Sequence, residues 1–257
     1  MVICKSLAEL EKMHRAGLLV WEALEGMRAM VQAGVSTKEL DDFAESYTAE
    51  HGARPAFKGY RGYPGSVCTS INQEIVHGIP SPSRRVKEGD ILSLDFGVEL
   101  DGYFADAALT VPVGRITSER EKLLRVTRES LERAIDKVRT GNRLGDVSSA
   151  VQQWVEKNGY SVVREFVGHG IGTKMHEDPQ LPNYGLPGQG ARLQEGMVLA
   201  IEPMVNRGGP AVRMLADEWT AVTADGSDSA HFEHSVAVTS NGPWILTRPK
   251  DATGPVW

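Results

Sequence analysis

Residues 90–111, DILSLDFGVELDGYFADAALTV, carry the pattern that decides the fold of this 257-residue chain. The apolar residues on either side of Glu99–Gly102 follow a period near two, which is typical of β-strands. The turn sequence Glu99-Leu-Asp-Gly102 contains an Asp-Gly pair, which favours a tight hairpin. We therefore expect strands over 90–98 and 103–111, joined as a hairpin, with Asp95 and Asp106 inside them.

Helices and further strands are expected on both sides of this hairpin. Capping boxes formed by Ser6 with Glu9 and by Ser36 with Glu39 mark the first two helix starts. Helical spacing of apolar residues predicts helices over about 6–32, 36–52, 118–138 and 144–158. Strand-like patterns recur at 67–71, 161–166, 197–203 and 232–238.

An internal duplication is indicated by the spacing of two glycine pairs. Gly34 and Gly141 are 107 residues apart, and so are Gly52 and Gly159. The same register aligns the apolar stripes of the helices between them. The expected fold is α+β, with helices packed on a mainly antiparallel sheet in two related halves, roughly 1–112 and 113–250. No linker separates the halves, so we expect one domain over 1–257.

Composition narrows the class of protein. A net charge of −6 and a pI near 5.7 argue against a surface that binds nucleic acid. The two cysteines, Cys4 and Cys68, form no CxxC motif, which excludes a disulfide scaffold and suits a reducing compartment. The chain has neither a signal-peptide pattern nor an apolar run long enough to span a membrane. We therefore expect a cytoplasmic enzyme.

Four carboxylates and one imidazole stand in apolar or glycine-rich contexts: Asp95, Asp106, His169, Glu202 and Glu233. Charged side chains are seldom buried unless they are paired or bound to metal, and the strands offer no matching Lys or Arg. This oxygen-rich set suits Mn, Fe or Co better than a structural zinc, and carboxylates can bridge two ions. The alternative is a purely structural ionic network.

Seven segments, taken in order, resemble the methionine aminopeptidase family, type I. They are GYPGSVCTSINQEIVHGIP, LDFG, DGYFADAALT, REFVGHGIG, HEDPQLPNYG, IEPM and HFEHSVAVT. The resemblance covers nearly the whole chain and implies the two-halved pita-bread fold, a curved sheet with helices packed on it. The connection from His169 to Glu202 lacks the long insertion of the type II enzymes, which favours a bacterial-style type I enzyme.

The resemblance also implies a site with two divalent ions (Co, Mn, Fe or Zn). Asp106 and Glu233 would bridge the ions, Asp95 would bind one of them, and His169 and Glu202 would bind the other. A hydroxide activated by the metals would attack the scissile carbonyl, with Glu202 as the proton acceptor. Two further catalytic residues are implied: His77 near the scissile amide nitrogen and His176 at the carbonyl oxygen.

The implied substrate-binding residues are His77 and His176 together with Tyr60, Tyr63, Cys68 and Trp219, and Phe57 and Met175 stand at two further pocket positions. The chain departs from the family pattern at four positions. Phe57 and Met175 replace cysteine and phenylalanine, Arg61 replaces histidine, and His231 replaces glutamine. His231 shares a strand face with Glu233, so it either supports the ligands, which we favour, or fills space. A monovalent cation is implied near Asn72 and Ser229.

The implied substrates are the N-termini of nascent polypeptides, with a small residue following the methionine. The ribosome is then a candidate partner, although no sequence feature supports it, and the chain is expected to be a monomer. A proline-directed peptidase is the first rival, but such enzymes usually have an extra N-terminal domain before the catalytic part. A metal-free binding protein is the second rival, and it should have lost ligands.

Overall fold

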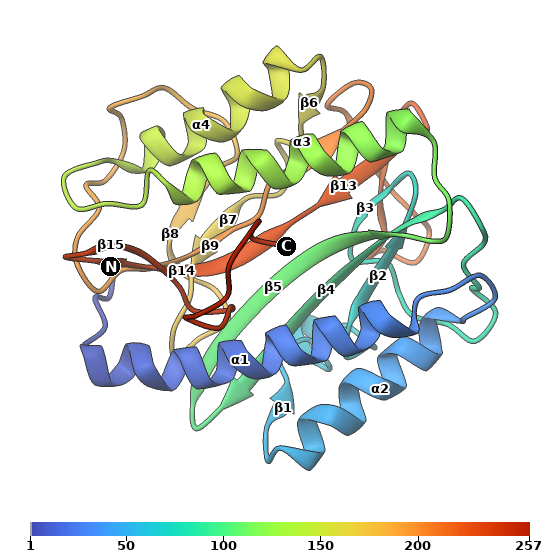
Figure 1. Cartoon of the computed structure of the whole chain (residues 1–257), viewed down its shortest axis with the longest axis horizontal. Helices are drawn as coiled ribbons and strands as arrows, with labels where there is room; N and C mark the ends of the chain where they lie inside the picture. Colours follow the sequence, from blue (N-terminus) through green and yellow to red (C-terminus); the bar gives the residue numbers. More distant parts are fainter. Residues whose placement is uncertain (1) are drawn as a thin grey trace.

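A computed structural model describes residues 2–257 of the chain. A nine-stranded, wholly antiparallel sheet crosses the centre of the molecule (Figure 1), and its main path is β1-β4-β5-β14-β9-β7-β8. Two more strands pair at its sides, β2 with β4 and β15 with β14. The strands are β1 (Arg54–Pro55), β2 (Cys68–Ile71), β4 (Ile91–Leu100), β5 (Tyr103–Pro112), β7 (Gly168–Gly170), β8 (Glu177–Leu181), β9 (Val198–Ile201), β14 (Glu233–Thr239) and β15 (Gly242–Ile245).

Two small antiparallel sheets complete the strand structure of the described chain. One has the order β13-β10-β6 and the other has the order β11-β12-β3. Their strands are β3 (Glu74–Val76), β6 (Ser161–Val162), β10 (Met204–Asn206), β11 (Val212–Met214), β12 (Ala221–Thr223) and β13 (Ser229–His231).

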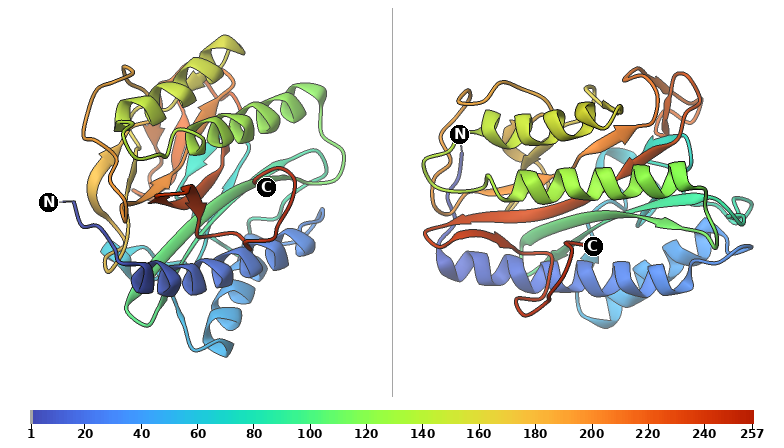
Figure 2. Two further views of the ribbon diagram at one scale, coloured as in Figure 1. Left: turned by 60° about the vertical axis from the view of Figure 1, so that its left-hand side comes forward. Right: turned by 45° about the horizontal axis from the view of Figure 1, so that its top comes forward.

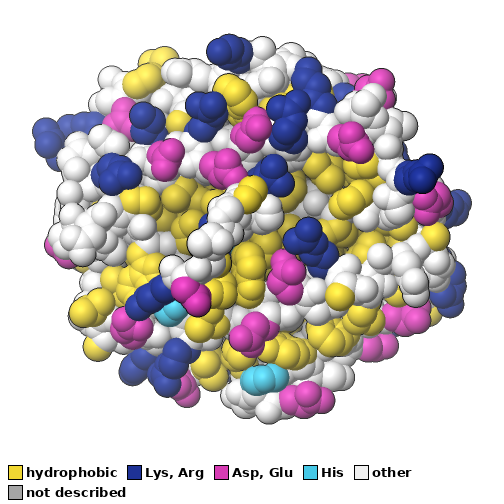
Figure 3. Space-filling model, in the orientation of Figure 1, with side chains coloured by type: hydrophobic (Ala, Val, Ile, Leu, Met, Phe, Trp, Pro, Cys, Tyr) yellow, Lys and Arg dark blue, Asp and Glu magenta, His cyan; other side chains and the backbone are white. Residues whose placement is uncertain are grey.

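Helices cover one side of the large sheet (Figures 1 and 2). They are α1 (Leu7–Met30), α2 (Thr37–Glu50), α3 (Ser118–Ile135) and α4 (Leu144–Lys157). Helix α1 packs on β4 and β5, while α3 pairs with α4 over the second half. Side chains of both charges are interspersed over the face that carries α1 and α3 (Figure 3). None of the described helices is both long and apolar enough to cross a membrane.

Local sequence signals explain where the elements begin and turn. Both predicted capping boxes form, at Ser6 and at Ser36. The β4–β5 hairpin is confirmed, with Asp101 and Gly102 at φ values of 52° and 79° that suit an Asp-Gly turn. The strand expected over 161–166 is shorter than predicted. Only its first two residues pair with β10, and Arg164 and Glu165 turn out to solvent.

The two halves repeat each other's backbone geometry at the offset of 107 residues. Gly34 and Gly141 have φ values of 96° and 93°, and Gly52 and Gly159 have 66° and 84°. Isolated bridges join Ser36 to Arg85 and, at the same offset, Arg143 to Arg192. The pseudo-symmetry predicted from the sequence is therefore present in the fold.

The last residues of the chain lie between α1 and α3, on the side of the central strands that the helices cover, which faces the viewer in Figure 1. The Trp257 ring stacks on Trp21 of α1 at 4.5 Å and on His234 of β14 at 4.7 Å. Trp257 Nε1 donates a hydrogen bond of 3.2 Å to the carbonyl oxygen of Glu233. The segment therefore joins helix α1 to the strand that begins with Glu233.

Helix α1 approaches the C-terminal segment through a glycine. A Cβ atom at Gly17 would lie 2.2 Å from the carbonyl oxygen of Leu246, which is backbone and cannot turn aside. The nearby His14 also contacts this oxygen, with its Nδ1 at 2.8 Å in position to donate a hydrogen bond to it. Only a residue without a side chain allows this contact.

Gly17→Ala is expected to lower the free energy of unfolding by about 1–3 kcal/mol, because the added methyl group forces the backbones apart. Gly26→Ala is the matched control in the same helix, since its methyl group would meet the ring of Phe43, which is a movable side chain. Denaturant unfolding of both variants measures the difference. Equal stability of the two variants would contradict the proposed close approach.

Candidate functional site

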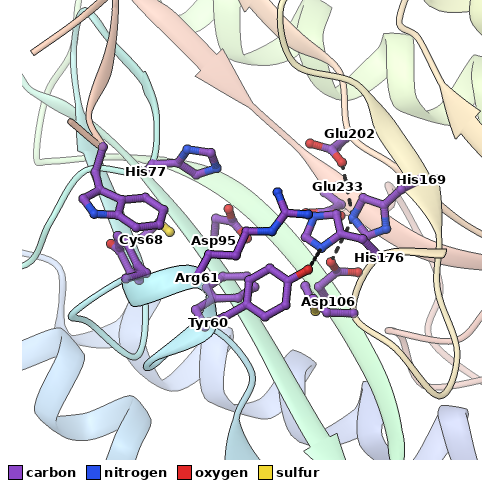
Figure 4. Close-up of a pocket in the computed structure, with 14 residues that line it drawn as sticks. Tyr60, Arg61, Cys68, His77, Asp95, Asp106, His169, His176, Glu202 and Glu233 are labelled. Carbon is purple, nitrogen blue, oxygen red and sulfur yellow. Dashed lines mark hydrogen bonds and ion pairs between the residues drawn. The ribbon is translucent and has the colours of Figure 1, made fainter.

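The five metal-ligand candidates face one pocket from five separate segments (Figure 4). Asp95 lies in β4, Asp106 in β5, and His169 in β7, while Glu202 follows β9 and Glu233 begins β14. The sequence separation between them is large, yet all five belong to strands of the same sheet or to its immediate edge. Sheet pairing is therefore what assembles the set.

Strand register explains how three carboxylates share one face. Asp95 of β4 and Glu233 of β14 are both the pairing partners of Ala108 in β5. Directly paired residues project to the same side of a sheet, and so do residues two apart on one strand, such as Asp106 and Ala108. The small side chain of Ala108 leaves open space between the carboxylates on either side of it.

His169 completes the set from β7, which is separated from β14 by β9. Its Nε2 lies 3.6 Å from Asp106 Oδ2 and 3.7 Å from Glu202 Oε1. Its Nδ1 lies 2.9 Å from the carbonyl oxygen of Gly170, to which it can donate its proton. That bond leaves Nε2 as the nitrogen with a free lone pair, facing the carboxylates. Three possible ligand atoms lie within 4.8 Å of one another, one from each of Asp106, His169 and Glu233.

The electrostatics of the pocket favour a bound cation. Burial, followed by repulsion from neighbouring carboxylates, raises the pKa of Asp95, Glu202 and Glu233 well above the usual range. Burial also raises the pKa of Asp106, to about 6. Glu233 Oε1 is buried without a hydrogen-bond partner among the described residues. An unpaired buried carboxylate oxygen beside three other carboxylates fits a cation ligand, so the residues present suit divalent metal.

Two residues that sequence reasoning missed hold the candidate ligands in place. Ser235 Oγ lies 2.9 Å from Asp106 Oδ1 and accepts a 3.2 Å hydrogen bond from the backbone N–H of Asp106. Asn183 Nδ2 donates to the carbonyl oxygen of Glu202 at 2.9 Å. Ser235 lies two residues beyond Glu233 on the same strand face, so the period of two could have identified it.

Two neutral histidines flank the carboxylates. Burial lowers the pKa of both His77 and His176 to about 4. His176 Nδ1 lies 2.9 Å from the hydroxyl of Tyr60, and the two rings stack at 5.3 Å. His77 packs its ring edge-on against Phe166 at 5.3 Å and Trp219 at 6.3 Å. Each imidazole therefore has a fixed orientation at the pocket.

The remaining wall of the pocket is apolar. Tyr63 meets Trp219 edge-to-face at 5.1 Å, and its hydroxyl donates to the carbonyl oxygen of Gly78 at 3.0 Å. Phe57 and Met175 converge over Gly97, where an added Cβ would lie 2.9 Å and 3.3 Å from their atoms. The cavity has a volume of about 150 Å³, which suits one side chain rather than a large ligand.

The structure brings all the site residues assigned from the sequence to this pocket. The lining residues are Phe57, Tyr60, Arg61, Tyr63, Cys68, His77, Asp95, Asp106, His169, Met175, His176, Glu202, Trp219 and Glu233. Asp95 and Glu202 are partly exposed, whereas Asp106, His169 and Glu233 are buried.

The other three residues singled out from the sequence, His231, Asn72 and Ser229, lie outside the pocket lining. His231 is buried, and neither ring nitrogen has a hydrogen-bond partner among the described residues, so its supporting role stays a prediction. Ser229 donates its backbone N–H to the carbonyl oxygen of Asn72 at 2.9 Å. The two residues are therefore neighbours, and the monovalent cation near them also stays a prediction.

A buried ion pair fixes the loop that carries His176. Lys5 Nζ lies 2.6 Å from Glu177 Oε2, and the two side chains are only 3% and 5% exposed. The other oxygen of this carboxylate accepts from the backbone N–H of Lys174 at 3.2 Å. The segment before α1 thus holds the turn directly next to His176. No local pattern in the sequence pointed to this long-range contact.

Comparison with known proteins gives a consistent result. The model of metallopeptidase family M24 matches residues 11–240. The chain is 52% identical over 248 residues to methionine aminopeptidase 1 of Bacillus subtilis, covering 96% of this chain and 100% of that protein. It is 46% identical to the solved methionine aminopeptidase of Thermotoga maritima, with a TM-score of 0.96 and coverage of 97% and 100%.

Proline-directed peptidases share the architecture at much lower identity. Prolidase from Pyrococcus furiosus has a TM-score of 0.76 and 23% identity, and this chain covers 66% of its length. At that identity the likeness establishes the fold alone. Together with the closer structure, it confirms the predicted pita-bread fold.

Lys5→Met is expected to lower the free energy of unfolding by about 3 kcal/mol, because it leaves the buried Glu177 carboxylate without its cation. The double variant Lys5→Met/Glu177→Leu removes both charges and should recover most of the loss. Arg15→Met is the matched control, since it removes an exposed pair with Asp101 and should change stability by less than about 1 kcal/mol. Chemical denaturation measures all three variants, and similar losses in Lys5→Met and Arg15→Met would argue against a buried pair.

Proposed function

The chain belongs to metallopeptidase family M24, and on that premise we propose how it works as a metal-dependent methionine aminopeptidase. The activity itself follows from relatives about half identical to the chain over nearly its whole length. The proposal adds two finer statements. Two divalent ions, held by the five candidate ligands, serve the hydrolysis, and the preferred substrates have a small residue after the methionine.

One observation carries the two-ion proposal. Four carboxylates and an imidazole face one pocket, and the buried oxygen Glu233 Oε1 has no partner among the described residues. Asp95, Asp106, His169, Glu202 and Glu233 would hold the ions. Two bound divalent ions would supply a hydroxide nucleophile from water at neutral pH and stabilise negative charge on the carbonyl oxygen. The oxygen-rich ligand set favours Co, Mn or Fe over Zn.

The chain's own residues position the peptide and move the protons. If the Tyr60 hydroxyl donates to Nδ1 of His176, that imidazole carries its proton on Nε2. It can then donate to the carbonyl oxygen of the substrate as negative charge develops there. Glu202, whose pKa is raised by burial and by Asp106, accepts the proton of the attacking water. His77, on the opposite side, faces the scissile amide nitrogen.

The apolar wall is suited to a methionine side chain. Tyr63, Trp219 and Cys68 offer aromatic and sulfur surface, with which a thioether makes favourable contacts. Phe57 and Met175 reduce the width of the pocket next to Gly97. We propose that the enzyme acts as a monomer on nascent chains in the cytoplasm, where the ribosome presents such N-termini.

Asp106→Asn and Glu233→Gln are each expected to reduce methionine release by at least about 100-fold, because each removes a charge from the metal set without removing its bulk. Titration calorimetry with Mn or Co should show fewer than two bound ions per chain. Asp101→Asn is the matched control, since this exposed aspartate lies at the turn of the same hairpin. Wild-type turnover in either site variant would refute the bridging role.

Methionine release from Met-Ala-Ser is expected to exceed release from Met-Lys-Ser and Met-Trp-Ser by at least about tenfold. The second residue must pass between the histidines beside a cavity of only about 150 Å³. Amino-acid analysis with the metal-loaded enzyme measures the release, and Ala-Pro-Ser serves as the control for proline-directed cleavage. Efficient cleavage before lysine or tryptophan would contradict the size limit.

A further inference from the structure

Arg61 is the one cation in the pocket lining, whose other residues are carboxylates, histidines and apolar side chains. It lies in the middle of the 3-10 turn η1 (Tyr60–Gly62), with φ 50° and ψ 20°. A non-glycine residue in this left-handed region costs about 1–2 kcal/mol. The flanking residues Gly59 and Gly62, with φ values of 80° and 92°, allow the turn to close around it.

Backbone hydrogen bonds hold this turn in one shape. Gly59 N–H donates to the carbonyl oxygen of Tyr63 at 2.8 Å, and Tyr63 N–H donates back to Tyr60 at 3.0 Å. The direction in which the Arg61 side chain leaves the backbone is therefore set by the turn. An arginine kept in a strained position at a pocket is a candidate for a role in binding.

The guanidinium of Arg61 rests on the aromatic wall of the site. Its central carbon lies 5.4 Å from the centre of the Tyr60 ring, which is within cation–π range. Tyr60 in turn contacts His176 by stacking and by its hydroxyl. Figure 4 shows the side chain extended over the pocket toward His176.

No carboxylate among the described residues forms an ion pair with Arg61, and the residue is exposed. The four ligand carboxylates line the same pocket as Arg61. If the proposed function holds, two divalent ions neutralise the four ligand carboxylates, so that they no longer attract the guanidinium. Arg61 is then an unpaired positive charge at the mouth of a neutral site.

We propose that Arg61 recognises an acidic side chain on the third residue of the substrate, so that the enzyme favours peptides of the form Met-small-Asp or Met-small-Glu. In the proposed binding mode the methionine side chain fills the cavity of about 150 Å³, and the second residue lies beside the histidines. The exposed guanidinium lies farther out, where the next residue leaves the pocket. This inference rests on the proposed function and names a substrate class within it.

The test compares kcat/KM for Met-Ala-Glu-Ser, Met-Ala-Gln-Ser and Met-Ala-Lys-Ser, all amidated so that a terminal carboxylate cannot substitute for the side chain. The Glu peptide is expected to exceed the Gln peptide by about two- to fivefold, as for other exposed ion pairs, and the Lys peptide should be poorest. The preference should shrink in high salt, because the pair is open to solvent.

Variants separate recognition by Arg61 from a general effect of charge. Arg61→Gln should bring the Glu/Gln ratio to about one, Arg61→Lys should retain part of it, and Arg61→Glu should invert it. Lys58→Gln is the matched control, because Lys58 lies on the same loop and its ammonium pairs with Glu45 away from the pocket. Lys58→Gln should leave the ratio unchanged. A wild-type ratio of one, or a preference that survives Arg61→Gln, would overturn the inference.

Equilibrium binding gives an independent readout. Calorimetry should show that Ala-Glu-Ser-amide binds the wild-type protein more tightly than Ala-Gln-Ser-amide, and that Arg61→Gln abolishes the difference. Equal binding of the two peptides by the wild-type protein would overturn the inference. Failure of the proposed function looks different, since no peptide would then release methionine with any metal, whereas the binding comparison would still report on Arg61.

Discussion

Repulsion between crowded carboxylates is the constraint on which the rest of this structure depends. Asp95 and Glu233 pair with the same residue of β5, and Asp106 projects from that strand on the same face. Burial raises the pKa of all three, so their ionised forms oppose folding unless cations join them. An antiparallel sheet can hold these carboxylates close together, because backbone hydrogen bonds fix the spacing of the strands even though the side chains repel one another.

The two ends of the described chain support opposite sides of this set. Near the start, Lys5 forms a buried ion pair with Glu177 and thereby fixes the loop of His176. At the other end, Trp257 stacks between α1 and β14 and hydrogen-bonds to the backbone of Glu233. Neither contact touches the reacting atoms. Both restrict the backbone that positions a functional side chain, which is how distant packing governs the geometry of the site.

The sequence predicted the parts of the fold and site that have local signals. The capping boxes and the Asp-Gly turn act within four residues, and charges inside apolar strands stand out by composition alone. Contacts between distant residues were not predictable in this way. Lys5 with Glu177 and Asp106 with Ser235 join positions 172 and 129 residues apart. The short strand at 161–162 was overestimated, because its length is set by its partner β10 rather than by its own composition.

The pseudo-symmetry of the fold explains why the site has four carboxylates and why it is nevertheless asymmetric. In the strand order β4-β5-β14-β9, the antiparallel pair β4–β5 belongs to the first half and the antiparallel pair β14–β9 belongs to the second half. The two halves meet where β5 pairs with β14. The offset of 107 residues relates Asp95 to Glu202. Asp106 and Glu233 are 127 residues apart, and they correspond by their place on the two adjacent inner strands β5 and β14. The strands that flank these differ. Cys68 of β2 pairs with Asp95, whereas His169 of β7 pairs with Ala200, two residues before Glu202. Each half of the duplicated fold thus contributes two carboxylates to the site. The flanking strands differ in what they add, because β2 lines the apolar part of the pocket and β7 adds an imidazole to the candidate metal ligands.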